Sequence, residues 1–147
     1  MKHRTVSELL RDQVSVQLPP EATVREAARL MAERRVGAVL VTEAGRLAGI
    51  FTERDLLNRV VAVGLDPDAT ALAAVMTRDP ATIEDGTAII EALRAMQSGG
   101  FRHLPVLRRG RVVGILSLRD FAASDLTEIE HEYDLERAIA EGGRPGR

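Results

Sequence analysis

The residues with the clearest chemical potential are a hydroxyl and a carboxylate three positions apart, and this pair occurs twice. Thr52 and Asp55 follow the apolar run that ends at Phe51, and Ser117 and Asp120 repeat the arrangement 65 residues further on. At a helix start, such a pair can form a capping box, in which the two side chains each accept a backbone N–H. The same place can bind an anion or a sugar, because free N–H groups meet the positive end of the helix dipole there. A single copy favours the cap, whereas the repetition favours a binding site.

No residue set for catalysis or metal binding accompanies these pairs. The chain has no cysteine, which excludes disulfides, thiolate zinc sites and thiol catalysis. The histidines His3, His103 and His131 are scattered, and no His, Asp or Glu cluster has the spacing of metal ligands. Ser117, His103 and Asp120 contain the residue types of a catalytic triad, but the chain lacks a Gly-x-Ser-x-Gly nucleophile elbow and a Gly-rich phosphate loop. The sequence therefore predicts no enzyme activity and no metal site.

The overall composition predicts a small cytoplasmic protein with an ordinary core. Of 147 residues, 45% are hydrophobic, which is typical of a globular chain. The net charge is −2 and 3% of the residues are aromatic, so neither a basic surface nor stacking platforms indicate nucleic-acid binding. The charged N-terminus leads into no signal peptide, and no run approaches the roughly 20 apolar residues that span a bilayer. We expect no membrane partner.

The two pairs belong to a longer duplication. Residues 26–56 align with residues 91–121 without a gap, and 11 of the 31 positions are identical, against roughly two expected by chance at ordinary composition. In each unit the apolar pattern predicts a strand, a helix, a hairpin of two strands and a second helix. The predicted strands are 14–16, 37–42 and 46–51 in the first unit and 81–83, 103–107 and 111–116 in the second. Three-residue turns ending in glycine join the hairpin strands.

The predicted helices each present one apolar face. The first helix starts at Thr23, with Glu26 as its capping partner, and the helix after Thr52 ends at Gly64. The residues expected to be buried are Val24, Ala27, Ala28 and Met31, then Leu56, Leu57, Val60 and Val61, and in the second unit Ile89, Ala92, Leu93 and Met96.

These elements predict an α+β fold in which two tandem repeats pack with pseudo-two-fold symmetry. Each unit of about 60 residues is marginal alone, so joining the sheet faces would create one core and two equivalent clefts. The expected divisions are repeat 1 with its lead-in turn (1–64), a linker (65–69), repeat 2 (70–123), an acidic C-terminal helix (124–141) and a disordered tail (142–147). The C-terminal helix either lies on its own domain or contacts a second subunit.

The repeated form Gly-apolar-x-[Thr/Ser]-x-x-Asp resembles the adenosine-nucleotide signature of the tandem CBS-domain pair, or Bateman module, of the stand-alone bacterial type. Arg-His-Leu-Pro-Val at 102–106 resembles a strand common in second CBS repeats. The resemblance covers about residues 6–123. It implies clefts for AMP, ADP or ATP and association of two pairs into a homodimer.

The resemblance also implies a role for individual residues. Asp55 and Asp120 would bind ribose, because a carboxylate accepts charge-assisted hydrogen bonds from both hydroxyls. The implied phosphate-binding residues are Thr52, Ser117, Arg54, Arg119, Arg102 and His103. The implied base-binding residues are Val16, Gln17, Leu18, Ala81, Thr82 and Ile83. Arg54 and Arg119 either meet phosphate or lie exposed on a helix turn, and His103 either meets phosphate or closes its strand.

The first repeat departs from this pattern, because Gly37 and Ala38 stand where the second has Arg102 and His103. We therefore expect one dominant site, with Ser117 and Asp120. The predicted function is a regulatory module that senses an adenosine nucleotide without catalysis and acts on an unknown protein partner. The alternatives are a ligand-free dimerisation or interaction scaffold and, third, an enzyme acting on a phosphoester.

Overall fold

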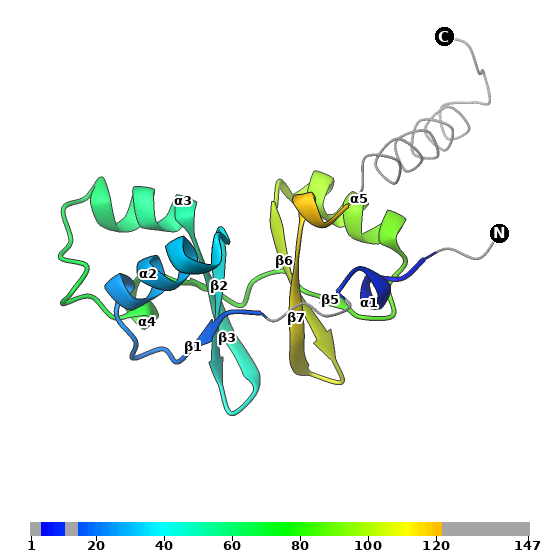
Figure 1. Ribbon diagram of the computed structural model, residues 1–147, viewed down its shortest axis with the longest axis horizontal. Helices are drawn as coiled ribbons and strands as arrows, with labels where there is room; N and C mark the ends of the chain where they lie inside the picture. The colour runs from blue at the N-terminus through cyan, green and yellow to red at the C-terminus, as the bar shows by residue number, and fades with distance from the viewer. Residues whose placement is uncertain (1–3, 11–14, 122–147) are drawn as a thin grey trace, which may run out of the picture.

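The computed structural model describes residues 4–10 and 15–121, and within them two sheets lie face to face with helices on their outer sides (Figure 1). The first repeat consists of β1 (Gln17–Leu18), α2 (Val24–Arg34), β2 (Ala38–Glu43), β3 (Arg46–Thr52), α3 (Glu53–Leu56) and the π-helix η1 (Leu57–Val61). The second consists of β5 (Ile83–Glu84), α5 (Ile89–Gly99), β6 (His103–Arg108), β7 (Arg111–Ser117) and the 3₁₀-helix η2 (Leu118–Asp120). The predicted α+β fold with two repeats is confirmed. The helix 124–141 and the tail 142–147 lie outside the described residues.

The first strand of each repeat is shorter and later than its sequence pattern predicts. The expected strands 14–16 and 81–83 are replaced by β1 and β5, which pair in parallel with β2 and β6 over two residues each. Alternation of apolar and polar residues indicates an extended segment, but a strand also needs a neighbouring backbone to pair with. In the first repeat that pairing is confined to Gln17 and Leu18, because the chain turns away at Pro19.

The hairpins are tighter than expected. Ala44 and Gly45 join β2 to β3, and Arg109 and Gly110 join β6 to β7, with positive φ at all four residues. Positive φ at both positions of a two-residue loop is the type I′ turn, whose twist matches that of the paired strands. The three-residue turns are therefore wrong by one residue, although both glycines stand where a left-handed conformation is needed.

The predicted apolar faces are confirmed for the long helices except at Ala28, which is only partly buried, and they are partly wrong for the helix after Thr52. Val24, Ala27 and Met31 are buried in α2, whose start is capped by the Thr23 hydroxyl. After Thr52, Val60 is buried but Leu57 and Val61 are 59% and 62% exposed. The Ala62 N–H bonds to the Leu57 carbonyl, an i→i+5 bond that inserts one residue into the turn. Leu57 follows Leu56, and Val61 follows Val60, by about 100° around the helix axis, so these two side chains turn away from the core that Leu56 and Val60 contact.

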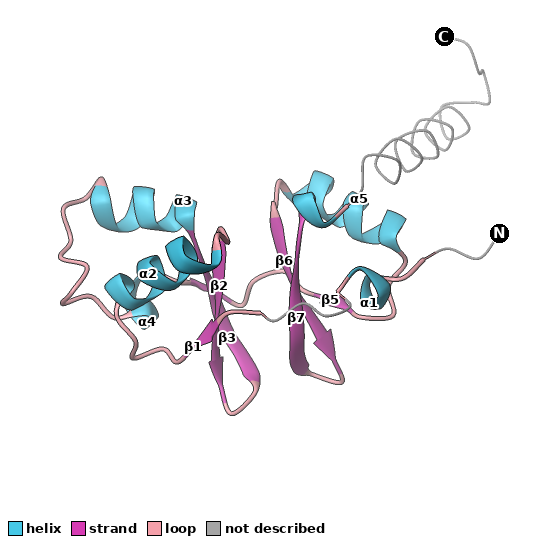
Figure 2. Ribbon diagram, viewed as in Figure 1, coloured by secondary structure: helices cyan, strands magenta, loops and turns pink. Residues whose placement is uncertain are grey.

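The two lead-in segments are exchanged between the repeats (Figure 2). The helix α1 (Val6–Leu9) packs in the second core, where Val6 is fully buried and Thr5 bridges to Ala88. The helix α4 (Leu72–Val75) packs in the first core, and β4 (Thr77–Arg78) pairs with β3. Each repeat therefore completes its core with a segment that the sequence order assigns to the other repeat.

A third apolar cluster joins the two sheets. Ala38, Leu40 and Ile50 are buried in it, and Leu47, Val112 and Ile115 pack against them. These side chains alternate along the hairpin strands with those that face the helices, as the period of two in a strand requires. The cluster fixes the two hairpins against each other and leaves their helix-bearing ends to form the site.

Candidate functional site

Both hydroxyl–carboxylate pairs form caps at the ends of β3 and β7. The Thr52 N–H donates to Asp55 Oδ2 at 3.0 Å, and the Asp55 N–H donates to Thr52 Oγ1 at 3.2 Å. In the second repeat, the N–H and the hydroxyl of Ser117 donate to Asp120 Oδ2 at 2.7 and 3.2 Å. The capping interpretation is therefore correct for both copies. The cap also holds each carboxylate in one position at the strand end, which is what a binding site requires.

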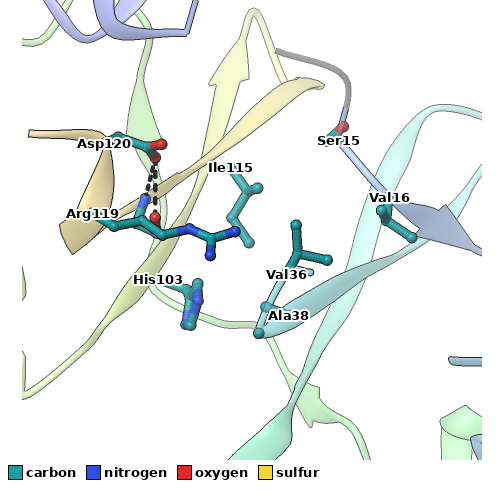
Figure 3. A pocket seen from close by; sticks show the side chains of 10 residues that line it. Ser15, Val16, Val36, Ala38, His103, Ile115, Arg119 and Asp120 are labelled. Atoms are coloured by element: carbon teal, nitrogen blue, oxygen red, sulfur yellow. Dashed lines mark hydrogen bonds between the residues drawn. The ribbon is translucent and has the colours of Figure 1, made fainter. Parts of the chain in front are cut away.

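In the second repeat, the capped pair lines a pocket of about 60 Å³ between the two repeats (Figure 3). The lining residues are Ser15, Val16, Val36, Gly37 and Ala38 from the first repeat and His103, Ile115, Ser117, Arg119 and Asp120 from the second. The pocket thus has one wall from each repeat. Figure 3 shows Asp120, Arg119 and His103 on one side and Ser15 and Val16 on the opposite side, so the polar and charged groups lie mainly at one end.

The structure brings together some of the site residues expected from the sequence. Those that line this pocket are Val16, His103, Ser117, Arg119 and Asp120. Those that do not line it are Gln17, Leu18, Ala81, Thr82, Ile83, Arg102, Thr52, Arg54 and Asp55. Ile83 instead packs against the second core, and Arg102 is exposed just before β6.

Sequence reasoning missed half of the lining. Ser15, Val36, Gly37, Ala38 and Ile115 belong to the pocket but carry no motif. For Ala38 a signal was available, because alternation with Leu40 places both on the face of β2 that meets the other sheet. For Ser15 and Val36 the signal lies in which segments meet across the repeats, and spacing along one chain does not contain it.

Arg119 ties the two walls together. Its Nη2 donates to the carbonyl of Arg35 at 2.6 Å, across 84 positions of sequence. Arg35 ends α2 in the left-handed conformation, with φ of 54° and ψ of 46°, and this conformation sets the direction of its carbonyl. Because Arg119 also lines the pocket, a guanidinium stands between the polar end of the pocket and the first repeat.

The pKa of His103 is lowered at the polar end of the pocket. Burial of the ring is the largest cause and lowers the pKa of His103. The negative charges of Glu53 and Asp120 raise this pKa. The positive charges of Arg119 and Arg102 lower it. A neutral imidazole has one donor and one acceptor nitrogen. An anion placed beside it would favour the protonated ring and so raise its pKa.

Asp55, the acid of the first repeat, lies beside the cation of Arg59. Arg59 Nε lies 3.7 Å from Asp55 Oδ1, and Arg59 Nη1 donates to the Val75 carbonyl at 3.0 Å. The Asp55 side chain is 13% exposed. This carboxylate is therefore already engaged by the helix that follows it and by its own cap.

Two further observations bear on the class of site. Within residues 4–10 and 15–121, no group of three or more His, Cys, Asp and Glu side chains could hold a metal ion. In the same part of the chain, no helix has the length and apolar character needed to cross a membrane.

Comparison with known proteins identifies one family. The family model of the CBS domain matches residues 6–62 and again residues 72–126. A CBS domain-containing protein of Arabidopsis thaliana is 38% identical over 138 residues, which cover 93% of this chain and 25% of the relative. The chain therefore spans about a quarter of the length of that relative. An uncharacterised 17.7 kDa protein of Acidianus ambivalens is 34% identical over 80% of this chain and 70% of its own length.

Solved structures give the same result. A CBS domain protein from Pyrobaculum aerophilum, complexed with AMP, is 34% identical and superposes with a TM-score of 0.79 over 87% of this chain and 99% of that one. A CBS-domain containing protein from Agrobacterium tumefaciens is 33% identical, with a TM-score of 0.72 over 80% of this chain and 95% of that one.

Proposed function

Because this chain belongs to the CBS-domain family, with two CBS domains in tandem, we propose that it is a regulatory module that binds an adenosine nucleotide and catalyses no reaction. The proposed site is the pocket between the repeats. The observation that carries the proposal is the placement of Asp120 and His103 at one end of a pocket whose other end is largely apolar, with Ser117 bonded to Asp120. The AMP complex of the Pyrobaculum aerophilum protein gives independent support.

Each part of the nucleotide has a matching group in this pocket. Asp120 binds the ribose diol, because a carboxylate held by its own cap can accept both hydroxyls. Ser117, His103 and Arg119 bind phosphate. Val16, Val36 and Ile115 supply apolar contacts for the base.

Ligand binding would link the two repeats. The cavity of about 60 Å³ is smaller than the roughly 300 Å³ or more of typical small-molecule sites. A nucleotide would therefore extend beyond the enclosed part of the cavity and would contact walls that belong to different repeats. A ligand that binds one arrangement of the two repeats more tightly than another would raise the population of that arrangement. A partner protein would respond to this shift.

The second-repeat site is the dominant one in this proposal. Asp120 lines the pocket between the repeats, and Asp55 does not line it. Ring and guanidinium donors, from His103 and Arg119, also gather at Asp120. We therefore assign one principal nucleotide site to each chain, and the phosphate contributes to its affinity.

The active species in this proposal is a homodimer. Leu57, Val61, Val63 and Leu65 form an exposed apolar strip on η1 and the turn after it, with exposures of 59%, 62%, 63% and 43%. Contiguous exposed apolar residues of this size are typical of interaction surfaces. A second copy of the chain would cover the strip.

A thermal-shift screen with AMP, ADP, ATP and S-adenosylmethionine tests the proposed function. A ligand at about 100 times its dissociation constant adds roughly 2.7 kcal/mol to the free energy of unfolding. For a chain of this size that corresponds to an increase in melting temperature of about 5–10 °C. An adenosine ligand should raise the melting temperature of the wild type and leave the melting temperature of the Asp120→Ala variant unchanged. If none of the four shifts the wild type, the ligand-free scaffold is the better account.

A further inference from the structure

A carboxylate of the first repeat lies beside the histidine of the pocket. Glu53 is the first residue of α3, and its N–H donates to the Gly37 carbonyl at 3.0 Å. A Cβ atom added at Gly37 would lie 3.0 Å from Glu53 Oε1 and 3.2 Å from His103 Cε1. Gly37 and His103 both line the pocket, and Figure 3 shows His103 across from Val36 and Ala38, the two neighbours of Gly37. The Glu53 carboxylate therefore lies next to the pocket, close to His103.

This carboxylate is not part of the repeated pattern of hydroxyl and acid. The residue equivalent to Glu53 in the second repeat is Leu118, which carries no charge. Burial is the largest cause that lowers the pKa of His103, and among the surrounding charges that of Glu53 acts most strongly on this pKa. The first repeat thus places a negative charge beside the group that is proposed to bind phosphate in the second.

We propose that Glu53 is a specificity-determining residue that disfavours nucleotides with more than one phosphate group. This inference rests on the proposed nucleotide function, in which Asp120 binds ribose and His103 and Arg119 bind the first phosphate. A second and a third phosphate continue past His103, away from the ribose, and there they meet the charge of Glu53. The carboxylate therefore opposes ADP and ATP more strongly than AMP.

The charge difference between the nucleotides makes the effect measurable. Two unit charges about 6 Å apart change an affinity by roughly threefold in water and by roughly tenfold at half the dielectric constant of water. AMP, ADP and ATP carry the same adenosine and first phosphate, so the contributions of Asp120, His103 and Arg119 cancel in the ratio of their affinities. The effect of Glu53 on the protonation of His103 cancels in the same way. The ratio therefore isolates the repulsion between Glu53 and the added phosphates.

The experiment is a calorimetric titration of AMP, ADP and ATP into the wild type and two variants, in EDTA so that no divalent cation neutralises the phosphates. The wild type should bind AMP more tightly than ATP. Glu53→Gln removes the charge and keeps the size of the side chain, so the ratio of the AMP affinity to the ATP affinity should fall by roughly three- to tenfold. Glu21→Gln removes the same charge from an exposed position in the turn before α2 and should keep the wild-type ratio. Because salt screens exposed charges, the difference between the wild type and Glu53→Gln should shrink between about 0.05 M and about 0.5 M NaCl.

The outcomes separate this inference from the proposed function. If AMP binds but Glu53→Gln keeps the wild-type ratio at low salt, or the wild type prefers ATP, the role of Glu53 is wrong and the site itself stands. An equal change in the ratio from Glu21→Gln would also overturn the role of Glu53, because the ratio would then depend on the net charge of the protein. If the wild type binds none of the three nucleotides, the proposed function fails and this inference fails with it. Melting temperatures of the variants establish that each one is folded.

Discussion

Replacing Arg119 by glutamine separates its two proposed roles, because the side chain both joins the repeats and faces the phosphate end of the pocket. Arg119→Gln removes the bond to the Arg35 carbonyl and the cation near His103. A charge-assisted hydrogen bond contributes about 1.5–3 kcal/mol. Arg119 is exposed, so the lower limit applies, and the affinity for AMP should fall by about tenfold.

Adenosine provides the internal comparison, because it lacks the phosphate. Adenosine lacks the group that Arg119 is proposed to bind, so its affinity for the variant should stay close to its affinity for the wild type. The assay is calorimetric titration of both ligands into the wild type, Arg119→Gln and the matched first-repeat variant Arg54→Gln, which should behave as wild type. Equal losses for AMP and adenosine, or an equal loss from Arg54→Gln, would refute the assignment of Arg119 to the phosphate.

Three further predictions concern protons, assembly and chemistry. Burial lowers the pKa of His103, and a bound phosphate should raise it. AMP binding should therefore take up a proton, and calorimetry in two buffers that shows no proton uptake would contradict this. The ratio of the AMP affinity of the wild type to that of His103→Gln should rise as the pH falls toward about 6.5. Taking this ratio cancels the titration of the phosphate itself. Val61→Asp should convert a dimer to a monomer in sedimentation, whereas the control Val113→Asp should not; a wild-type monomer at micromolar concentration excludes the dimer. Purified protein should not hydrolyse ATP or AMP, and turnover that disappears in Asp120→Ala would show catalysis.

Local patterns predicted the elements of this fold well, because each depends on residues close in sequence. The duplication located both hairpins, and Thr52 and Ser117 marked the strand ends where the structure places their caps. Gly100 ends α5 with φ of 69° and an N–H bonded to the Met96 carbonyl, the left-handed helix end that glycine adopts without strain. The failures at Leu57 and Val61 arise because the prediction gave this helix a wider buried face than the one that contacts the core, where Leu56 and Val60 lie.

The composition of the site was harder to predict, because it depends on contacts between the repeats. The motif residues Ser117 and Asp120 reach the pocket as expected, but their opposite wall comes from Ser15, Val36 and Gly37 of the first repeat. Pseudo-two-fold symmetry predicts two equivalent clefts without saying which segments face each other. The exchange of α1 and α4 between the cores has the same origin, since an apolar turn packs equally well on either sheet by pattern alone.

Titration of AMP into the wild type, Asp120→Ala and Asp55→Ala tests the central claim most directly. The two acids occupy equivalent positions in the repeat, and each accepts the N–H of the residue three positions before it, so each substitution removes one such backbone bond. We expect one principal site per chain, with AMP binding abolished by Asp120→Ala and largely kept by Asp55→Ala. Equal losses from the two substitutions, or loss from Asp55→Ala alone, would contradict the assignment of nucleotide binding to the pocket beside Asp120.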